Sequence, residues 1–334
     1  MKMKKHFLYL MVLVSATCMA GCGEIPETER DSTERITVGP GPEDMVLDTL
    51  HGPPRLLVSC TGRREAHMPY GEIESLDLSS GKRAILTRTG EPPELNFRPH
   101  GIYLDGRVLY VISHEREPDL HPVLVYRVRE DRLEFMEMIN SPLLHSPNAL
   151  VTGPRGEIYV VNDSGKRGSM AEKALKMRRA SVVRLTRNNE GVMTGELVAV
   201  KLGYPAGINR IGDTLFAGDA ILHRVHLFRI TGDGLEPAGE IRNLRGNDNI
   251  RIHQGKILTP GHVKPLRFIK HAGNPGKLSP VSVFLADPVT GQVETVFSTD
   301  GTLISAGSSA IIHGDYLYIC QVFDPFILKV PLEP

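Results

Sequence analysis

Short aliphatic runs alternate with polar turn positions along nearly the whole chain, and one such pattern recurs six times. Each time a polar or small residue opens an aliphatic strand, and a second short strand follows. The six openings are Glu43-Asp44, His100, Asn148, Ala206, Asp248-Asn249 and Ser308-Ser309. Consecutive openings lie roughly 45 to 60 residues apart, which is the length of a four-stranded propeller blade.

This repeat predicts an all-β protein, a six-bladed β-propeller over residues 35–334. The last blade offers three strands, Ala310–His313, Asp315–Val322 and Ile327–Val330. The N-terminal segment Arg35–Val38 supplies the missing fourth, since pairing of the two chain ends closes a propeller without a free sheet edge. The innermost strands of a propeller line one channel, so the six openings converge at its mouth. That ring holds carboxylates, amides and a histidine, which indicates a site.

Composition agrees with this architecture. The 334 residues are 41% hydrophobic, and 33 Gly and 24 Pro suit a chain with many turns. The formal net charge is zero, so no bulk attraction to nucleic acid is expected.

The first 21 residues read as a lipoprotein signal peptide. Three lysines precede the apolar run Phe7–Val14, which is too short for a stable membrane-spanning helix. Met19-Ala20-Gly21-Cys22 resembles the bacterial lipobox, in which the Cys is acylated. We therefore expect a lipidated Cys22, a polar tether over residues 22–34, and a location in the bacterial cell envelope, anchored by lipid to a membrane and facing outside the cytoplasm. An ordinary secretory signal is the alternative.

Removal of the signal leaves Cys60 and Cys320 in apolar strands. They are either free thiols in the core, which their apolar setting favours, or a disulfide, which export permits.

Two basic insertions, Ser164–Ala180 and Val263–Pro280, interrupt the regular spacing of the strands. The first contains a possible short helix over Met170–Met177. Both are either solvated loops or walls beside the channel mouth that offer cations to an anionic ligand.

Several short segments, in this order and spacing, resemble the paraoxonase/arylesterase family and, more distantly, the gluconolactonase/regucalcin family of six-bladed propellers. They include Gly41-Pro42-Glu43-Asp44, Pro99-His100-Gly101-Ile102, Ile112-Ser113-His114, Pro147-Asn148, Asp248-Asn249-Ile250 and Gly261-His262. The likeness spans residue 35 to the C-terminus.

The resemblance implies calcium in the channel, held by Glu43, Asn148, Asp248 and Asn249, which carry the hard oxygens that calcium prefers. One family Asn is replaced by Ala206, which has no ligand atom. A second, structural calcium would match Asp44 and the Ile102 carbonyl, but its further Asp is Ala149 here, so that site is expected to be absent or weak.

The resemblance also assigns roles to histidines. His100 and His114 fall where the family carries a pair proposed to activate water, with His100 as base and His114 orienting it. His223 and His262 align with pocket histidines. The structural alternative is that His100 is a turn residue and that His114 is a strand-end residue hydrogen-bonded to backbone.

Three functions remain open. The first is a calcium-dependent hydrolase of a small-molecule ester or lactone, with a lactone or aryl ester as substrate. The second is a non-catalytic propeller lipoprotein that binds a small ligand or a protein partner, which the Ala206 and Ala149 replacements favour. The third is a metal-free enzyme on the same scaffold. No Gly-x-Ser-x-Gly elbow occurs, which argues against a serine nucleophile.

Overall fold

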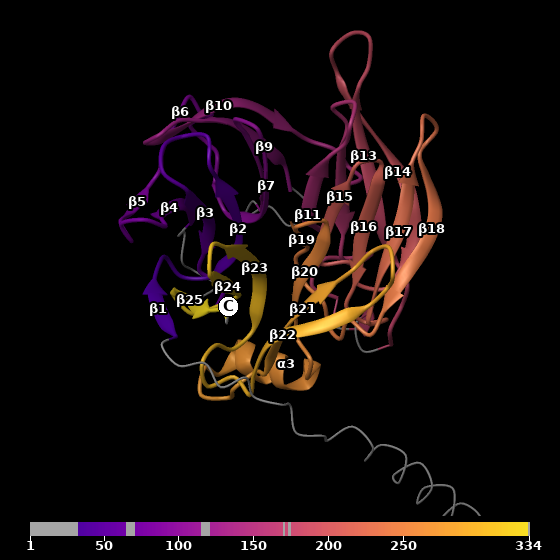
Figure 1. Ribbon diagram of the computed structural model, residues 1–334. Coiled ribbons are helices and arrows are strands. Elements are labelled where there is room, and N and C mark those ends of the chain that lie inside the picture. Colours follow the sequence, from indigo (N-terminus) through magenta and orange to yellow (C-terminus); the bar gives the residue numbers. More distant parts are fainter. Residues whose placement is uncertain (1–32, 65–70, 115–120, 170, 173–174, 333–334) are drawn as a thin grey trace, which may run out of the picture.

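The computed structural model describes residues 33–64, 71–114, 121–169, 171–172 and 175–332. Within these residues the strands form six sheets arranged as a ring, which is a six-bladed β-propeller (Figure 1). The predicted fold is confirmed. The signal peptide, Cys22 and most of the tether lie outside the described residues, as does part of the predicted Met170–Met177 helix.

Each blade is a four-stranded antiparallel meander numbered here from the N-terminus. Blade one consists of β2 (Pro42–Asp48), β3 (Arg55–Thr61), β4 (Gly71–Asp77) and β5 (Arg83–Ile85). Blade two consists of β7 (Pro99–Asp105), β8 (Val108–Ser113), β9 (Val123–Val128) and β10 (Arg132–Ile139). Blade three consists of β11 (Pro147–Thr152), β12 (Ile158–Asn162), β13 (Ala180–Arg187) and β14 (Met193–Leu202).

The remaining blades follow the same order. Blade four consists of β15 (Ile208–Ile211), β16 (Thr214–Asp219), β17 (Arg224–Ile230) and β18 (Leu235–Arg242). Blade five consists of β19 (Arg251–His253), β20 (Lys256–Gly261), β21 (Val281–Ala286) and β22 (Val293–Thr299). Blade six consists of β23 (Gly307–His313), β24 (Tyr316–Gln321), β25 (Phe326–Pro331) and β1 (Glu34–Thr37).

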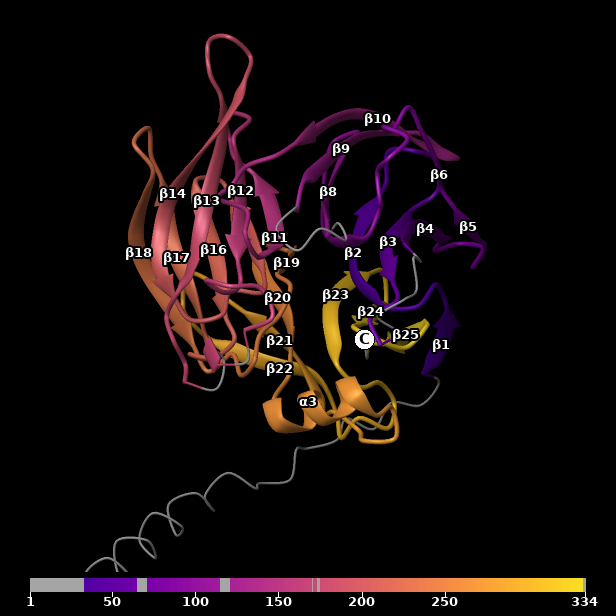
Figure 2. The ribbon, with the colours of Figure 1, turned by 180° about the vertical axis from the view of Figure 1, so that it is seen from behind.

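The chain ends close the ring as the strand count predicts. β1 pairs antiparallel with β25, and Arg35 lies opposite Leu328 while Ile36 lies opposite Ile327. Both ribbon views show these two strands side by side (Figures 1 and 2). One pairing was not predicted. A short strand, β6 (Thr87–Thr89), leaves blade one and joins blade two parallel to β10, which gives that sheet a fifth strand.

The hydrophobic core lies between neighbouring blades. One cluster joins Val46 and Leu57 of blade one to Ile102 and Leu109 of blade two, and similar clusters follow around the ring. Every residue of β11 is buried, whereas the outer strand β14 is mostly exposed or half-buried. Burial therefore decreases from the inner strand of this blade to its outer strand, which carries the exposed polar surface.

The Val263–Pro280 insertion contains a helix, α3 (Pro265–Gly273), which begins with proline at its first turn, where the missing N–H costs nothing. Cys60 and Cys320 are buried, and both are free in the described part of the chain. Over the same described ranges, no helix has the length and apolar character needed to cross a membrane.

Removal of β1 should destabilise the propeller, because β25 would then present an unpaired edge. We expect a chain that starts at residue 39 to unfold at lower temperature than one that starts at residue 33, and to self-associate through β25. Thermal unfolding and light scattering on the two chains measure this. Equal stability and a monomeric state for the shorter chain would show that closure does not depend on β1.

Candidate functional site

The first residues of the innermost strands meet at one end of the channel. Two glycines permit the close approach of neighbouring strands there. A Cβ on Gly101 would lie 2.2 Å from the Asn148 carbonyl oxygen, and a Cβ on Gly207 would lie 2.4 Å from that of Asp248. Ser308 Oγ donates to the Glu43 carbonyl over 2.6 Å, which ties blade six to blade one.

The predicted metal ligands lie in this mouth. Asn249 Nδ2 donates to Glu43 Oε1 over 3.1 Å, and His100 Nε2 lies 3.8 Å from the same oxygen. Asp248 Oδ2 contacts His262 Nε2 at 2.8 Å. Asn148 Nδ2 donates to Asp163 Oδ2 over 3.4 Å.

Three buried oxygens of this set have no hydrogen-bond partner among the described residues. They are Glu43 Oε2, Asn148 Oδ1 and Asn249 Oδ1. Buried oxygen atoms normally accept at least one hydrogen bond, so a cation or a water molecule could bind to these three. Among the described residues, no group of three or more His, Cys, Asp or Glu side chains is placed so that it could hold a metal ion. The predicted ligand set is not such a group, because two of its four residues are asparagines.

A guanidinium also reaches the site. Arg63, which follows β3, donates through Nη2 to His100 Nδ1 over 2.7 Å. The same Nη2 lies 3.9 Å from Glu43 Oε2. Because arginine is always a donor, Nδ1 of His100 is the acceptor, and the proton of the neutral ring sits on Nε2.

The histidines form a stack. The ring centroids of His100 and His114 are 4.8 Å apart, and those of His114 and His121 are 4.9 Å apart. His114 Nδ1 lies 3.3 Å from His121 Nδ1. Nε2 of His114 is buried without a hydrogen-bond partner among the described residues.

Burial sets the electrostatics of the mouth. It raises the pKa of Glu43 to about 8, helped by the nearby charges of Asp44 and Asp248 and opposed by Arg63. It lowers the pKa of His100 well below its usual range, as do the charges of Arg63 and Arg167. The Asn148 amide opposes that shift, which places it beside the His100 ring. The pKa of His114 is lowered in the same way.

The α3 insertion forms a wall of the mouth, as one of the two interpretations of this segment proposes. The rings of His262 and Phe268 lie 4.2 Å apart, and Phe268 and Phe323 lie 5.7 Å apart. Arg64 covers the Phe323 ring at 4.7 Å and donates to His271 Nε2 over 2.9 Å. α3 lies at the lower edge of both ribbon views (Figures 1 and 2).

The four predicted histidines therefore differ in setting. His100, His114 and His262 are partly buried in the mouth, whereas His223 is exposed. Nδ1 of His223 accepts a hydrogen bond from the Gly246 amide over 3.2 Å, so this ring is bonded to backbone.

Beneath the mouth, Arg251 of β19 occupies the position expected for the second calcium. Its Nη2 lies 2.5 Å from Asp44 Oδ1 and donates to the Ile102 carbonyl over 3.1 Å. Its Nε donates to the Met45 carbonyl over 2.9 Å. A guanidinium thus already supplies positive charge to the two groups that would have faced that ion.

Sequence reasoning missed Arg63, His121 and Tyr204. Ser146 and Ser164 both bond to Asp163, the latter over 2.7 Å, and burial together with Asp163 raises the pKa of Tyr204 well above its usual range. The order of strands in a blade could have indicated these residues. The second strand of every blade ends at the mouth, so the residues after β3, β8 and β12 belong to the same ring as the openings.

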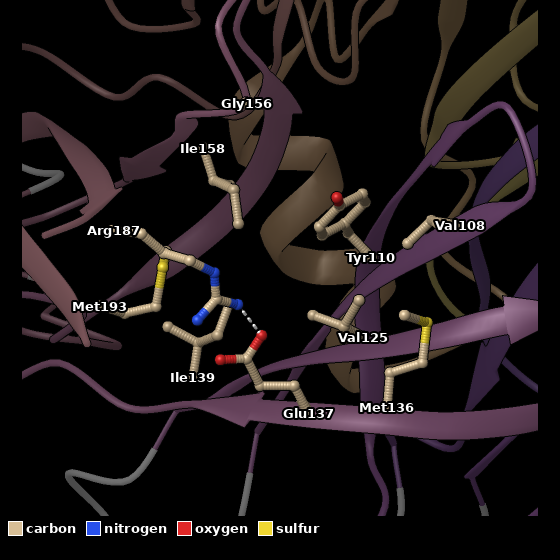
Figure 3. Close-up of a pocket in the computed structure, with 10 residues that line it drawn as sticks. All are labelled: Val108, Tyr110, Val125, Met136, Glu137, Ile139, Gly156, Ile158, Arg187 and Met193. Atoms are coloured by element: carbon tan, nitrogen blue, oxygen red, sulfur yellow. Dashed lines mark hydrogen bonds and ion pairs between the residues drawn. The ribbon is translucent and has the colours of Figure 1, made fainter. Parts of the chain in front are cut away.

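A separate cavity of about 430 Å³ lies between blades two and three. Its walls are mainly aliphatic, and an Arg187–Glu137 ion pair spans it beside the Tyr110 phenol (Figure 3). None of the predicted site residues lines this cavity, so the channel mouth is the candidate site.

Comparisons with known proteins show the fold. No known family and no curated protein matches the sequence. A luciferin-regenerating enzyme superposes with a TM-score of 0.57 at 10% identity, covering 90% of this chain and 95% of that one. A PQQ-bound aldose sugar dehydrogenase from Streptomyces coelicolor superposes with a TM-score of 0.52 at 15% identity, covering 93% and 100%.

A nidogen/laminin complex also matches, with a TM-score of 0.50 at 14% identity over 78% of this chain and 80% of that one. The neighbours thus define the class as a six-bladed-propeller-like protein. They include enzymes and a protein–protein complex alike, so the function must be argued from the mouth.

Removal of the Arg251 guanidinium should be strongly destabilising, because it leaves Asp44 as an uncompensated buried charge. We expect Arg251→Met to lower the free energy of unfolding by about 3–5 kcal/mol, and Asp44→Asn in the same chain to restore part of it. Urea unfolding at pH 7 measures both. Arg132→Gln, on the exposed β9–β10 hairpin, is the control. A loss below about 1 kcal/mol, the scale of a surface pair, would contradict this account.

Proposed function

We propose that this protein is a calcium-dependent hydrolase of lactones or aryl esters, anchored to a membrane of the cell envelope through lipid on Cys22. The observation that carries the proposal is the set of buried oxygens on Glu43, Asn148 and Asn249 that accept no hydrogen bond from a described residue. The nearby Asp248 carboxylate acts on Glu43 through its charge. Carboxylate and amide oxygens are what calcium selects. A buried carboxyl with a pKa of about 8 is a group that a cation would stabilise in its charged form.

These residues suit the ion but do not complete its shell. Calcium takes about six to eight oxygens, so water and substrate supply the rest, including the place that Ala206 leaves open. When bound, the ion would polarise the substrate carbonyl and stabilise negative charge on its oxygen.

In the histidine stack, His100 and His114 would have different roles in proton transfer. Arg63 fixes His100 as the tautomer with its proton on Nε2, which suits a hydrogen-bond donor. Nε2 of His114 has no hydrogen-bond partner among the described residues, and the lowered pKa of His114 keeps its ring neutral at pH 7. In the tautomer in which His114 Nδ1 donates to His121 Nδ1, Nε2 can accept a proton. In this proposal His114 deprotonates the attacking water and His100 positions it, which exchanges the roles expected from the family resemblance.

Two observations favour the alternative of a non-catalytic binding propeller. The Arg63 guanidinium lies 3.9 Å from Glu43 Oε2 and already places positive charge beside this carboxylate. The buried Ala206 removes a ligand oxygen from the ring. Direct measurement of calcium binding separates the two functions.

Calcium should bind the metal-free protein once, with moderate affinity, in isothermal titration calorimetry. Ala206→Asn should tighten binding by up to about thirty-fold, because an ordered water costs about 0–2 kcal/mol to immobilise. Glu43→Gln should abolish binding, whereas Glu134→Gln, a matched change on the outer surface, should leave it intact. No heat of binding in the unaltered protein would exclude the calcium site.

Hydrolysis should depend mainly on His114. We expect His114→Gln to lower kcat for a lactone or aryl ester by about 10²–10⁴-fold, the usual contribution of a general base, and His100→Gln to cost less. Calcium affinity should be unchanged in both variants, and a chelator should abolish the activity. If a broad panel of lactones and aryl esters shows no chelator-sensitive turnover, the binding propeller is the better description.

A further inference from the structure

We propose that the channel mouth recognises a substrate that carries a carboxylate apart from its reacting ester or lactone, and that Arg63, Arg98 and Arg167 bind this carboxylate. The inference names the substrate class of the proposed hydrolase and rests on that function for the reacting group. The carboxylate subsite itself rests on the placement of the three arginines.

Arg63 is held in the mouth with donors to spare. Its Nη1 donates to the Thr61 carbonyl over 3.1 Å, and its Nη2 donates to His100 Nδ1 over 2.7 Å. Its approach to Glu43, at 3.9 Å, is longer than a hydrogen bond. A guanidinium has five N–H donors, so donors on Arg63 remain for a ligand that lies beside His100.

Arg98 and Arg167 flank the same histidines. The Arg98 amide donates to Ser113 Oγ over 3.0 Å, and its carbonyl accepts from the His114 amide over 2.9 Å. Arg167 is exposed and follows Asp163 in the loop after β12. Neither guanidinium has an ion pair or hydrogen bond with a described residue. Arg98 precedes His100 by two residues, and the charges of Arg98 and Arg167 both lower the pKa of Arg63, so the three charges are close enough to interact.

Positive charge in the mouth is available to an anion. Asp44 is paired with Arg251 and Asp248 contacts His262, whereas the guanidinium groups of Arg98 and Arg167 have no ion pair with a described residue. Guanidinium groups without a fixed acidic partner attract anions and raise their rate of entry. The flat fork of arginine matches the two oxygens of a carboxylate.

The test is equilibrium binding to the full chain in the presence of a chelator, so that arginine rather than metal is probed. Succinate, its neutral diamide succinamide and inorganic phosphate are titrated by calorimetry at pH 7.5. We expect succinate to bind, succinamide not to bind, and succinate affinity to fall with added salt. Arg98→Gln and Arg167→Gln should each weaken succinate binding by about ten-fold or more, as loss of a hydrogen bond to a charged group does, while Arg132→Gln should have no effect.

Equal binding of succinate and succinamide, or unchanged succinate affinity in the Arg98→Gln/Arg167→Gln double variant, would overturn the proposal. Tighter binding of phosphate than of succinate would overturn the assignment to a carboxylate. Thermal unfolding confirms that each variant is folded, and the salt dependence of the unaltered protein is independent of any variant.

Turnover separates this inference from the hydrolase proposal. The 4-nitrophenyl monoester of succinic acid is compared with neutral 4-nitrophenyl butanoate, and a lower KM for the charged ester is expected. Succinate binding without hydrolysis of any ester supports the carboxylate subsite and refutes the hydrolase. Calcium-dependent hydrolysis without preference for the charged ester supports the hydrolase and refutes the carboxylate subsite.

Discussion

The contact between Arg251 and Asp44 connects three blades at the centre of the ring. Arg251 comes from blade five, and it reaches Asp44 and the Met45 carbonyl in blade one and the Ile102 carbonyl in blade two. Asp44 in turn accepts from the Ile102 amide over 2.9 Å. A buried guanidinium needs carboxylate and carbonyl partners because desolvation is costly. These bonds therefore fix the relative position of the inner strands. They also fix the position of Glu43, which is adjacent to Asp44, and of His100, which lies two residues before Ile102.

Above this contact, the mouth is a place where burial and charge oppose each other. Oε2 of the buried Glu43 accepts no hydrogen bond from a described residue, and Arg63 approaches it only to ion-pair distance. Such incomplete satisfaction is unusual in a core and is common where a ligand completes the network. The α3 wall limits access from one side through Phe268 and Phe323, so a ligand meets a site with one aromatic side and one cationic side.

The sequence predicted the blades and the closure well, because both depend on local patterns. Inner strands such as β11 are uniformly buried around a short aliphatic run, turns are marked by Gly and Pro, and the strand missing at one end is present at the other. The openings identified Glu43, Asn148 and Asp248 as neighbours for the same reason.

Local sequence patterns could not predict where long side chains reach or which histidine nitrogen carries the proton. Arg63 and Arg251 are ordinary basic residues in the sequence, and only the packed fold shows that their guanidinium groups reach His100 and Asp44. The proton position on His100 depends on Arg63 and not on any neighbour in sequence. α3 begins without a side-chain cap, so the usual helix signal was absent, and β6 crosses to a sheet that its sequence neighbours do not share.

The pairing of β1 with β25 also has a consequence for biosynthesis. Glu34 and its partner Lys329 are 295 residues apart, so the first strand to emerge from the ribosome must wait for the last. At about 5–20 residues per second, this delay is roughly 15 to 60 seconds, during which five blades can form while the ring stays open. A prematurely terminated chain never acquires its closing partner. Completion of the circle thus reports that translation has passed β25, and a product that stops before β25 keeps an open edge that quality-control factors can recognise.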